Sequence, residues 1–229
     1  MSELRGTARL ARLHARRDRV LLAVCAVAIP ALLAASAVSL KDLYPTPEER
    51  ARYAASFASD TAVAATQGNP VNLETIGGIL TFETGVWYSL FVALATLLLV
   101  NRYTRGDEEA GRLELVLSTA VGRHAPTAAA LAVTSALSVV TGALAFGALI
   151  AVGYEAVGSL ALAAWFAGLG IVFAAIAALA AQLFESKRTT TGIALAALGV
   201  AWLVRAIADA GADWLRWLSP IGWGQEIQP

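Results

Sequence analysis

The chain has 229 residues, of which 58% are hydrophobic and 15% are charged. Soluble domains have roughly a quarter of their residues charged, so this composition argues against a soluble globular protein. The 17 basic and 17 acidic residues cancel, and net charge gives no reason to expect a nucleic-acid partner. With one cysteine (Cys25) and two histidines (His14 and His124), a cysteine–histidine metal cluster is not expected.

The amino-terminal segment 1–19 is predicted to contain an amphipathic helix over residues 4–19. Arginines recur at steps of three and four residues, which places them on one face of a helix. They are Arg5, Arg9, Arg12, Arg16 and Arg19. Because such a face is attracted to anionic headgroups, we expect these arginines to bind lipid at the inner membrane surface. A basic tail that only sets the topology is the alternative.

Five apolar stretches follow, and each is near the roughly 20 residues that a helix needs to cross a bilayer core. They are residues 20–40, 85–100, 126–152, 157–184 and 189–204. The sequence therefore predicts an all-α, polytopic transmembrane helix bundle with about five spans. A cleaved signal peptide is the alternative for the first stretch, which contains Ala35-Ser36-Ala37, but its length favours a retained span.

Basic residues orient the predicted spans. They gather in segment 1–19 and in the loops after the second and fourth stretches. Since cytoplasmic loops are enriched in Lys and Arg, we expect a cytoplasmic amino terminus in a plasma membrane. Aromatic residues, which prefer the membrane interface, support this topology. Near the expected outer ends lie Trp87, Tyr88, Tyr154, Trp214, Trp217 and Trp223.

The first outer segment, residues 41–83, is predicted to form a short extracellular helical cap. Thr46 and Glu49 have the spacing of a capping box, which marks a helix start. The following Ala-rich stretch, 48–66, is predicted to be one short helix. Gly77-Gly78 is expected to break the chain before the second span begins. The segment is too small for an independent domain and is expected to pack on the bundle.

The cytoplasmic loop 101–125 differs from the other loops. An acidic stretch is followed by a Leu-rich segment, 112–118, which is predicted to be a short amphipathic helix suited to the groove of a partner. The residues expected to contact that partner are Glu108, Glu109, Arg112, Leu113, Glu114, Val116, Leu117 and Arg123. A solvated loop that only connects two spans is the alternative.

Residues 208–229 are predicted to be an outer interfacial segment, with a helix from Asp209 to Trp217. We expect Arg205 to form an ion pair with Asp209 at the outer surface, or to extend toward the interface. No further apolar run follows, and the chain is expected to stop before a sixth span.

No catalytic arrangement is apparent. Glu108-Glu109 followed by Arg112 is similar to the glutamate motif of intramembrane CAAX proteases, but that chemistry needs histidines within the spans, and both histidines lie outside them. The only lysines, Lys41 and Lys187, do not follow a phosphate-binding glycine loop. We therefore expect no enzymatic activity and no bound cofactor.

The loop 101–125 carries a family resemblance. Two motifs in it resemble the permeases of ABC-type-2 exporters, and among these the bacterial polyketide-antibiotic or multidrug exporter permeases. The motifs are Asp107-Glu108-Glu109-Ala110-Gly111-Arg112-Leu113-Glu114-Leu115 and Leu117-Ser118-Thr119-Ala120-Val121-Gly122-Arg123. Ala120 stands where the family usually has proline. The resemblance implies six spans in each permease half, an interfacial amino-terminal helix and a coupling helix that sits in a groove of an ATPase.

We interpret residues 1–229 as a single transmembrane permease domain, matching the first half of an exporter of hydrophobic or amphipathic small molecules. The resemblance implies an ABC ATPase subunit that binds ATP and Mg²⁺, and a second permease half or subunit. A membrane scaffold or regulatory subunit, which binds a partner through residues 101–125 without transport, is the alternative. The sequence does not identify substrate-binding residues.

Overall fold

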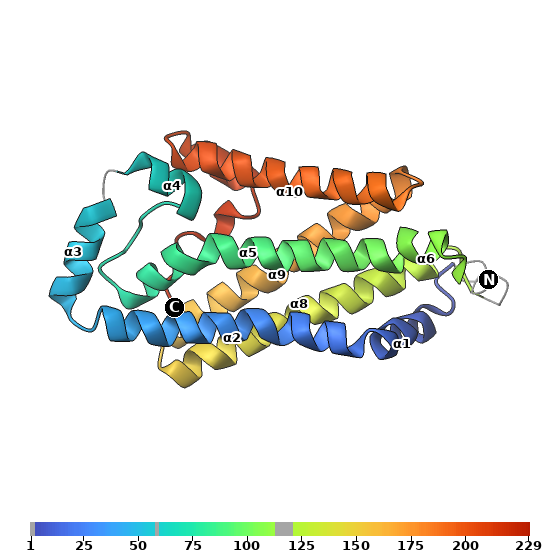
Figure 1. Cartoon of the computed structure of the whole chain (residues 1–229), viewed down its shortest axis with the longest axis horizontal. Helices are drawn as coiled ribbons and strands as arrows, with labels where there is room; N and C mark the ends of the chain where they lie inside the picture. Colours follow the sequence, from blue (N-terminus) through green and yellow to red (C-terminus); the bar gives the residue numbers. More distant parts are fainter. Residues whose placement is uncertain (1–2, 58–59, 113–120) are drawn as a thin grey trace.

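The computed structural model describes residues 3–57, 60–112 and 121–229, and this part of the chain contains helices and no strands (Figure 1). Five of the described helices are long and apolar enough to cross a membrane. They are α2 (Arg19–Leu43), α5 (Ile76–Tyr103), α8 (Ala125–Val152), α9 (Ala156–Leu183) and α10 (Lys187–Asp209). The prediction of an all-α bundle with about five spans is confirmed.

Helix α9 packs along both α8 and α5, while α2 packs on α8 and α10 packs on α5 and α9. Its side chains Phe166 and Phe173 are fully buried in the main apolar core. Glycines bring α8 and α9 close together: a Cβ on Gly142 would lie 2.7 Å from the Ala163 carbonyl oxygen. Such small residues allow helix backbones to approach closely in lipid.

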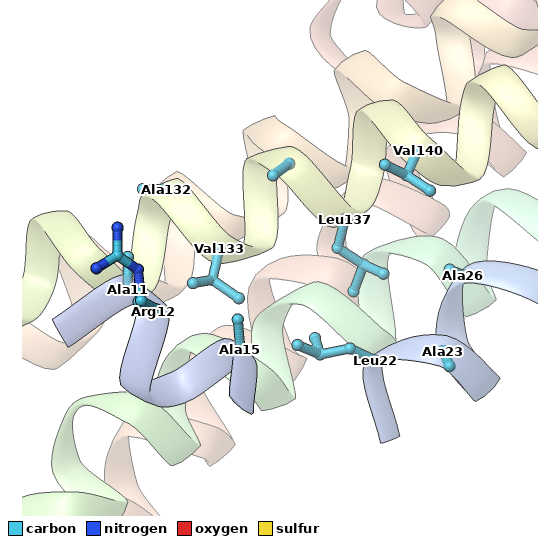
Figure 2. Close-up of a pocket in the computed structure, with 11 residues that line it drawn as sticks. Ala11, Arg12, Ala15, Leu22, Ala23, Ala26, Ala132, Val133, Leu137 and Val140 are labelled. Carbon is cyan, nitrogen blue, oxygen red and sulfur yellow. The ribbon is translucent and has the colours of Figure 1, made fainter. Parts of the chain in front are cut away.

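Two short helices lie at one end of the bundle, which we call the amino-terminal end (Figure 1). These are α1 (Thr7–Arg17) and α6 (Arg105–Glu109). The predicted helix 4–19 is therefore shorter than expected, since it ends at Arg17 and Arg19 already belongs to α2. Helix α1 packs on α8, and an apolar groove runs between α1, α2 and α8 (Figure 2).

The opposite end, the cap end, carries α3 (Pro47–Phe57) and α4 (Thr61–Gln67). The predicted capping box is present: the Thr46 amide donates to Glu49 Oε2 at 3.1 Å, and the Glu49 amide donates to Thr46 Oγ1 at 3.3 Å. The prediction of one continuous helix over residues 48–66 is wrong. The Asp60 carboxylate accepts hydrogen bonds from the Ala62 and Val63 amides, each at 3.0 Å, and so starts a second helix.

Gly77-Gly78 does not break the chain, contrary to the prediction, because α5 already begins at Ile76. Thr75 caps this helix by accepting a hydrogen bond from the Gly78 amide at 2.9 Å. A Cβ at either glycine would clash with backbone, at Pro229 for the first glycine and at Asn72 for the second. The pair therefore allows close packing inside a helix rather than ending one.

The chain after α10 forms two 3-10 helices, η1 (Asp213–Leu218) and η2 (Gly222–Gly224). The predicted helix from Asp209 to Trp217 is wrong, since α10 ends at Asp209 and the chain turns through Gly211, whose φ is +130°. Trp214, Trp217 and Trp223 are exposed at the cap end, as expected of interfacial aromatics, whereas Tyr154 is buried.

Candidate functional site

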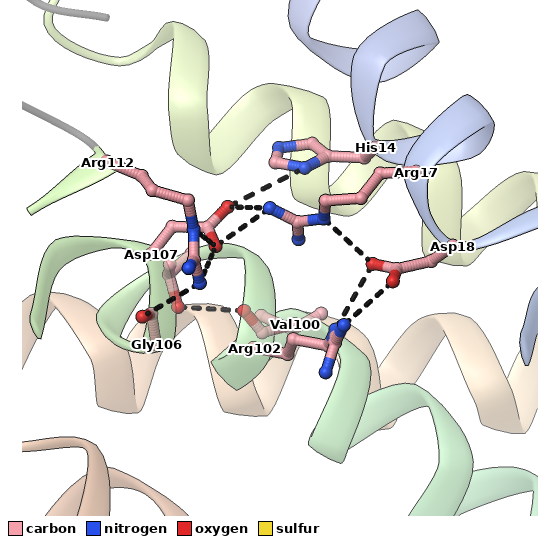
Figure 3. A network of polar contacts seen from close by, with 9 residues as sticks. His14, Arg17, Asp18, Val100, Arg102, Gly106, Asp107 and Arg112 are labelled. Carbon is pink, nitrogen blue, oxygen red and sulfur yellow. Dashed lines mark hydrogen bonds and ion pairs between the residues drawn. The ribbon is translucent and has the colours of Figure 1, made fainter. Parts of the chain in front are cut away.

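A network of charged side chains joins α1, α5 and α6 at the amino-terminal end of the bundle (Figure 3). Its first centre is Asp107 on α6, a buried carboxylate. Arg17 Nη1, from the end of α1, donates to both Asp107 oxygens at 3.0 Å. Arg112, which follows α6, donates through Nε to Asp107 Oδ1 at 2.9 Å. One carboxylate thus ties the first helix to the start of the loop between the second and third spans.

The second centre is Asp18, the residue between α1 and α2. Arg102, in the last turn of α5, donates to it through two nitrogens, at 2.7 and 3.1 Å. Arg17 Nε donates to the same carboxylate at 3.2 Å, so Arg17 bridges Asp18 and Asp107. Burial raises the pKa of Asp18, but the hydrogen bonds from Arg102 and Arg17 outweigh it, and the net pKa is lowered.

His14 completes the network on the α1 side. Its ring stacks on Tyr103 of α5, with 4.4 Å between the ring centroids, and its Nδ1 lies 3.7 Å from Asp107 Oδ2. Burial lowers the pKa of His14, and the neighbouring Asp107 only partly opposes this. The neutral imidazole is therefore the favoured form near pH 7 and packs as a ring on Tyr103.

The start of the loop is also bound to the fourth and fifth long helices. Glu109 Oε1 accepts a hydrogen bond from the Lys187 amide, in the first turn of α10, at 2.7 Å. Arg105 Nε donates to the Ala181 carbonyl oxygen of α9 at 2.7 Å. Asn101 Nδ2 donates to the Lys187 carbonyl oxygen at 3.0 Å. A displacement of α6 would therefore strain its contacts with α1, α9 and α10.

The structure locates half of the residues predicted to contact an ATPase. Glu109 and Arg112 have partners within the chain, Glu108 is exposed and pairs with Arg105, and Arg123 is exposed beside Glu3. Leu113, Glu114, Val116 and Leu117, with the predicted coupling helix they form, lie outside the described residues. That any of these eight residues contacts an ATPase stays a prediction.

The sequence analysis missed the centres of this network. The structure shows three buried residues in it that were not proposed as site residues: His14, Asp18 and Asp107. One signal was present: Asp18 is an isolated acid between Arg17 and Arg19. An acid in such a basic stretch is a natural partner for a nearby arginine, but its main partner, Arg102, lies 84 positions away.

Comparison with known proteins confirms the resemblance given by the loop. No family model matches the sequence. The chain is 40% identical, over 225 residues, to the multidrug efflux system permease protein Rv1217c of Mycobacterium tuberculosis. The chain is similar to an efflux permease. The alignment covers 98% of this chain and 41% of the relative, so the chain spans about two-fifths of the relative's length.

The predicted lipid-binding arginines of this permease-like chain are all exposed: Arg5, Arg9, Arg12, Arg16 and Arg19. Within the described part of the chain, their side chains make no hydrogen bond or ion pair, in contrast to Arg17. Leu10 and His14, on the other face of α1, are buried against the bundle. The stripe is therefore available to a ligand, and its contact with lipid stays a prediction.

A second charged cluster lies at the cap end. Arg205 and Asp209 of α10 form an ion pair at 3.2 Å, and both side chains are 0% exposed. The predicted pair therefore exists, but it is buried rather than at the outer surface. Arg205 Nη2 also donates to the carbonyl oxygens of Ala65 and Thr66, at 2.8 and 3.3 Å, at the end of α4. Gln225 Nε2 donates to Asp209 at 2.7 Å. This cluster holds the cap and the carboxyl-terminal segment on α10.

In the part of the chain that the structure describes, metal-ligating side chains do not gather at either end. Among residues 3–57, 60–112 and 121–229, no group of three or more His, Cys, Asp or Glu side chains could hold a metal ion. The chemistry that the two clusters offer is ion pairing and hydrogen bonding between helices.

Proposed function

We propose that this chain is the membrane-spanning permease part of an ATP-powered exporter of hydrophobic or amphipathic small molecules. The observation that carries the proposal is the set of contacts at the start of the loop between the second and third spans. Asp107 ties it to α1, Arg105 to α9 and Glu109 to α10. The similarity to a multidrug efflux system permease supports it. The five long apolar helices fit a multi-pass plasma membrane protein.

In this proposal the loop is the input point for work done by a separate ABC ATPase. The ATPase binds ATP and Mg²⁺, and this chain binds neither. A pull on the segment after Arg112 passes through Asp107 to Arg17 on α1, and through Glu109 to the first turn of α10. Coupling between the ATPase and the transport path is then a free energy carried by these contacts.

The proposal sets the orientation of the bundle. The amino-terminal end, with its exposed arginine stripe, faces the cytoplasm, in accord with the positive-inside rule. The cap helices α3 and α4 and the exposed tryptophans then face outward. The proposed assembly also contains a second permease half or subunit, and the transport path lies between the two halves.

Co-expression with a candidate ABC ATPase from the same genome tests the proposal. We expect the two proteins to copurify and to expel a fluorescent amphiphile from the vesicle membrane only when ATP is hydrolysed. Replacing both Leu113 and Leu117 by glutamate should abolish copurification and transport, because charges oppose docking in an apolar groove. The matched control is Leu218→Glu, at an exposed leucine of the cap end, which should leave copurification unchanged.

Charge reversal at Glu109 or Arg112 would not isolate the contact with the ATPase, since both side chains have partners within the chain. The leucine variants are therefore the sharper test. Copurification without ATP-dependent transport of any amphiphile would support the alternative, a scaffold or regulatory subunit. Copurification that survives the double leucine substitution would contradict the proposed input point.

A further inference from the structure

An open groove of about 510 Å³ lies between α1, α2 and α8 (Figure 2). Alanines form much of its wall, among them Ala23 and Ala26 on α2 and Ala132 and Ala136 on α8. Because these side chains are short, the two helices leave the space between them unfilled. Its volume is within the range of about 300–1,000 Å³ that is usual for ligand pockets.

Arg12 supplies a charged side chain to the groove, and the other residues that line it are alanine, leucine and valine. It comes from α1 and lies at the amino-terminal end of the groove, with its guanidinium between α1 and α8 (Figure 2). Arg12 is exposed and has no hydrogen bond or ion pair within the described part of the chain, and the same holds for its stripe neighbours Arg9 and Arg16. The groove thus combines a long apolar wall with an uncompensated positive charge at one end.

We propose that this groove binds one acyl chain of an anionic phospholipid, with the lipid phosphate held by Arg12. The wall belongs to α2 and α8, which are long and apolar enough to span a membrane, so it faces the depth at which acyl chains lie. Helix α1 directly precedes α2 and has a basic face, so we expect it at the depth of the headgroups. Charge and shape together select this occupant. An inorganic anion would gain nothing from the alanine wall, and a cationic amphiphile would be repelled by Arg12.

The occupant would brace α1 against α8. Ala11 and Ala15 of α1 form one side of the groove, and Arg17, two residues after Ala15, holds Asp107. A bound lipid would therefore help to set the position of the helix from which the charged network is built. The inference needs only that α2 and α8 span a membrane, and it does not depend on transport or on an ATPase.

Native mass spectrometry of the whole chain in detergent tests the inference. Phosphatidylglycerol and phosphatidylcholine with the same acyl chains are offered at equal concentration. We expect one phosphatidylglycerol to be retained preferentially, and Arg12→Gln to weaken its binding about tenfold, because a charge-assisted contact to phosphate is lost. The matched control is Arg5→Gln, in the same stripe but outside the groove, which should change binding little.

A second variant tests the acyl chain separately. Ala136→Phe fills the groove and should lower the retention of both lipids, while size-exclusion and thermal melting confirm that the variant folds. Equal retention of the two lipids, or no effect of Arg12→Gln, would show ordinary annular lipid and overturn the proposal. So would competition by inorganic phosphate alone, or full retention in Ala136→Phe, since either would indicate an anion site without an acyl chain.

Discussion

The two ends of the bundle use the same kinds of charged residues in different surroundings. At the cap end, Arg205 and Asp209 are both fully buried. At the amino-terminal end the carboxylates are buried, but the side chains of Arg102 and Arg112 remain 49% and 54% exposed. A buried pair is costly to separate, whereas an ion pair in contact with water exchanges its partners at low cost. The cap end is therefore built to stay fixed, and the amino-terminal end is able to rearrange.

This difference fits the proposed function. If an ATPase moves the loop at the amino-terminal end, the contacts at that end must rearrange, while the contacts at the opposite end must hold the helices together. The network around Asp107 meets the first need, because its arginines reach the carboxylate from partly solvated positions. The cluster around Arg205 meets the second, because it joins α4 and the carboxyl-terminal segment to one helix.

The largest expected effect is at the cap end. Replacing Asp209 by Leu should destabilise the protein by about 3–5 kcal/mol, because it leaves the Arg205 charge buried without its partner. The double variant Arg205→Met with Asp209→Leu should recover part of this loss, since the Arg205 charge is then removed as well and Arg216, 3.6 Å from Asp209 Oδ1, keeps its ion pair with Glu226. Denaturant titration of the purified chain in micelles measures both. Equal or greater loss in the double variant would show that burial of the unpaired charge is not the cause.

A smaller effect is expected at the amino-terminal end. Asp107→Asn should cost about 1–2 kcal/mol, since the partner arginines can be solvated when the carboxylate charge is removed. The change should be local: hydrogen exchange of the α1 amides should rise while that of α3 stays the same. Loss of protection spread evenly over the bundle would instead mean that the network is as rigid as the cap cluster.

The capping box of α3 provides a smaller test that is confined to the cap end. Thr46→Ala removes the hydroxyl that accepts from the Glu49 amide and should cost about 1 kcal/mol. The matched control is Ser56→Ala, near the end of the same helix, where no amide is capped. Hydrogen exchange should rise in the first turn of α3 in the Thr46 variant alone, and equal changes in both would contradict the cap.

The smallest expected effect is a pH dependence at the amino-terminal end. The pKa of folded His14 is below its usual value of 6.5, so protonation disfavours the folded state. The contribution of His14 to stability is therefore complete above about pH 6.5 and is lost as the pH falls through the lower folded-state pKa. Melting temperature measured from pH 7.5 to pH 5 should show this fall. The fall should be reduced in His14→Gln, and an unchanged pH profile in that variant would contradict it.

The five spans and the start of α3 could be read from the sequence because they depend on local features. Hydropathy over some twenty residues identifies a membrane helix, and Thr46 and Glu49 form their capping box across three positions. The Leu-rich loop also carried the resemblance to exporter permeases, which the efflux relative confirms over 98% of the chain. In each case the residues that interact are neighbours along the chain.

The tertiary structure decided which charges are buried and which glycines are needed. Asp18 meets Arg102, and Arg17 meets Asp107, only because the end of α1 lies beside the end of α5 and α6. The sequence spacing predicts the pair of Arg205 with Asp209, but its burial depends on α4, about 140 positions earlier. Such pairs are set by the packing of distant helices, whose faces cannot be assigned from hydropathy when every side of a span is apolar.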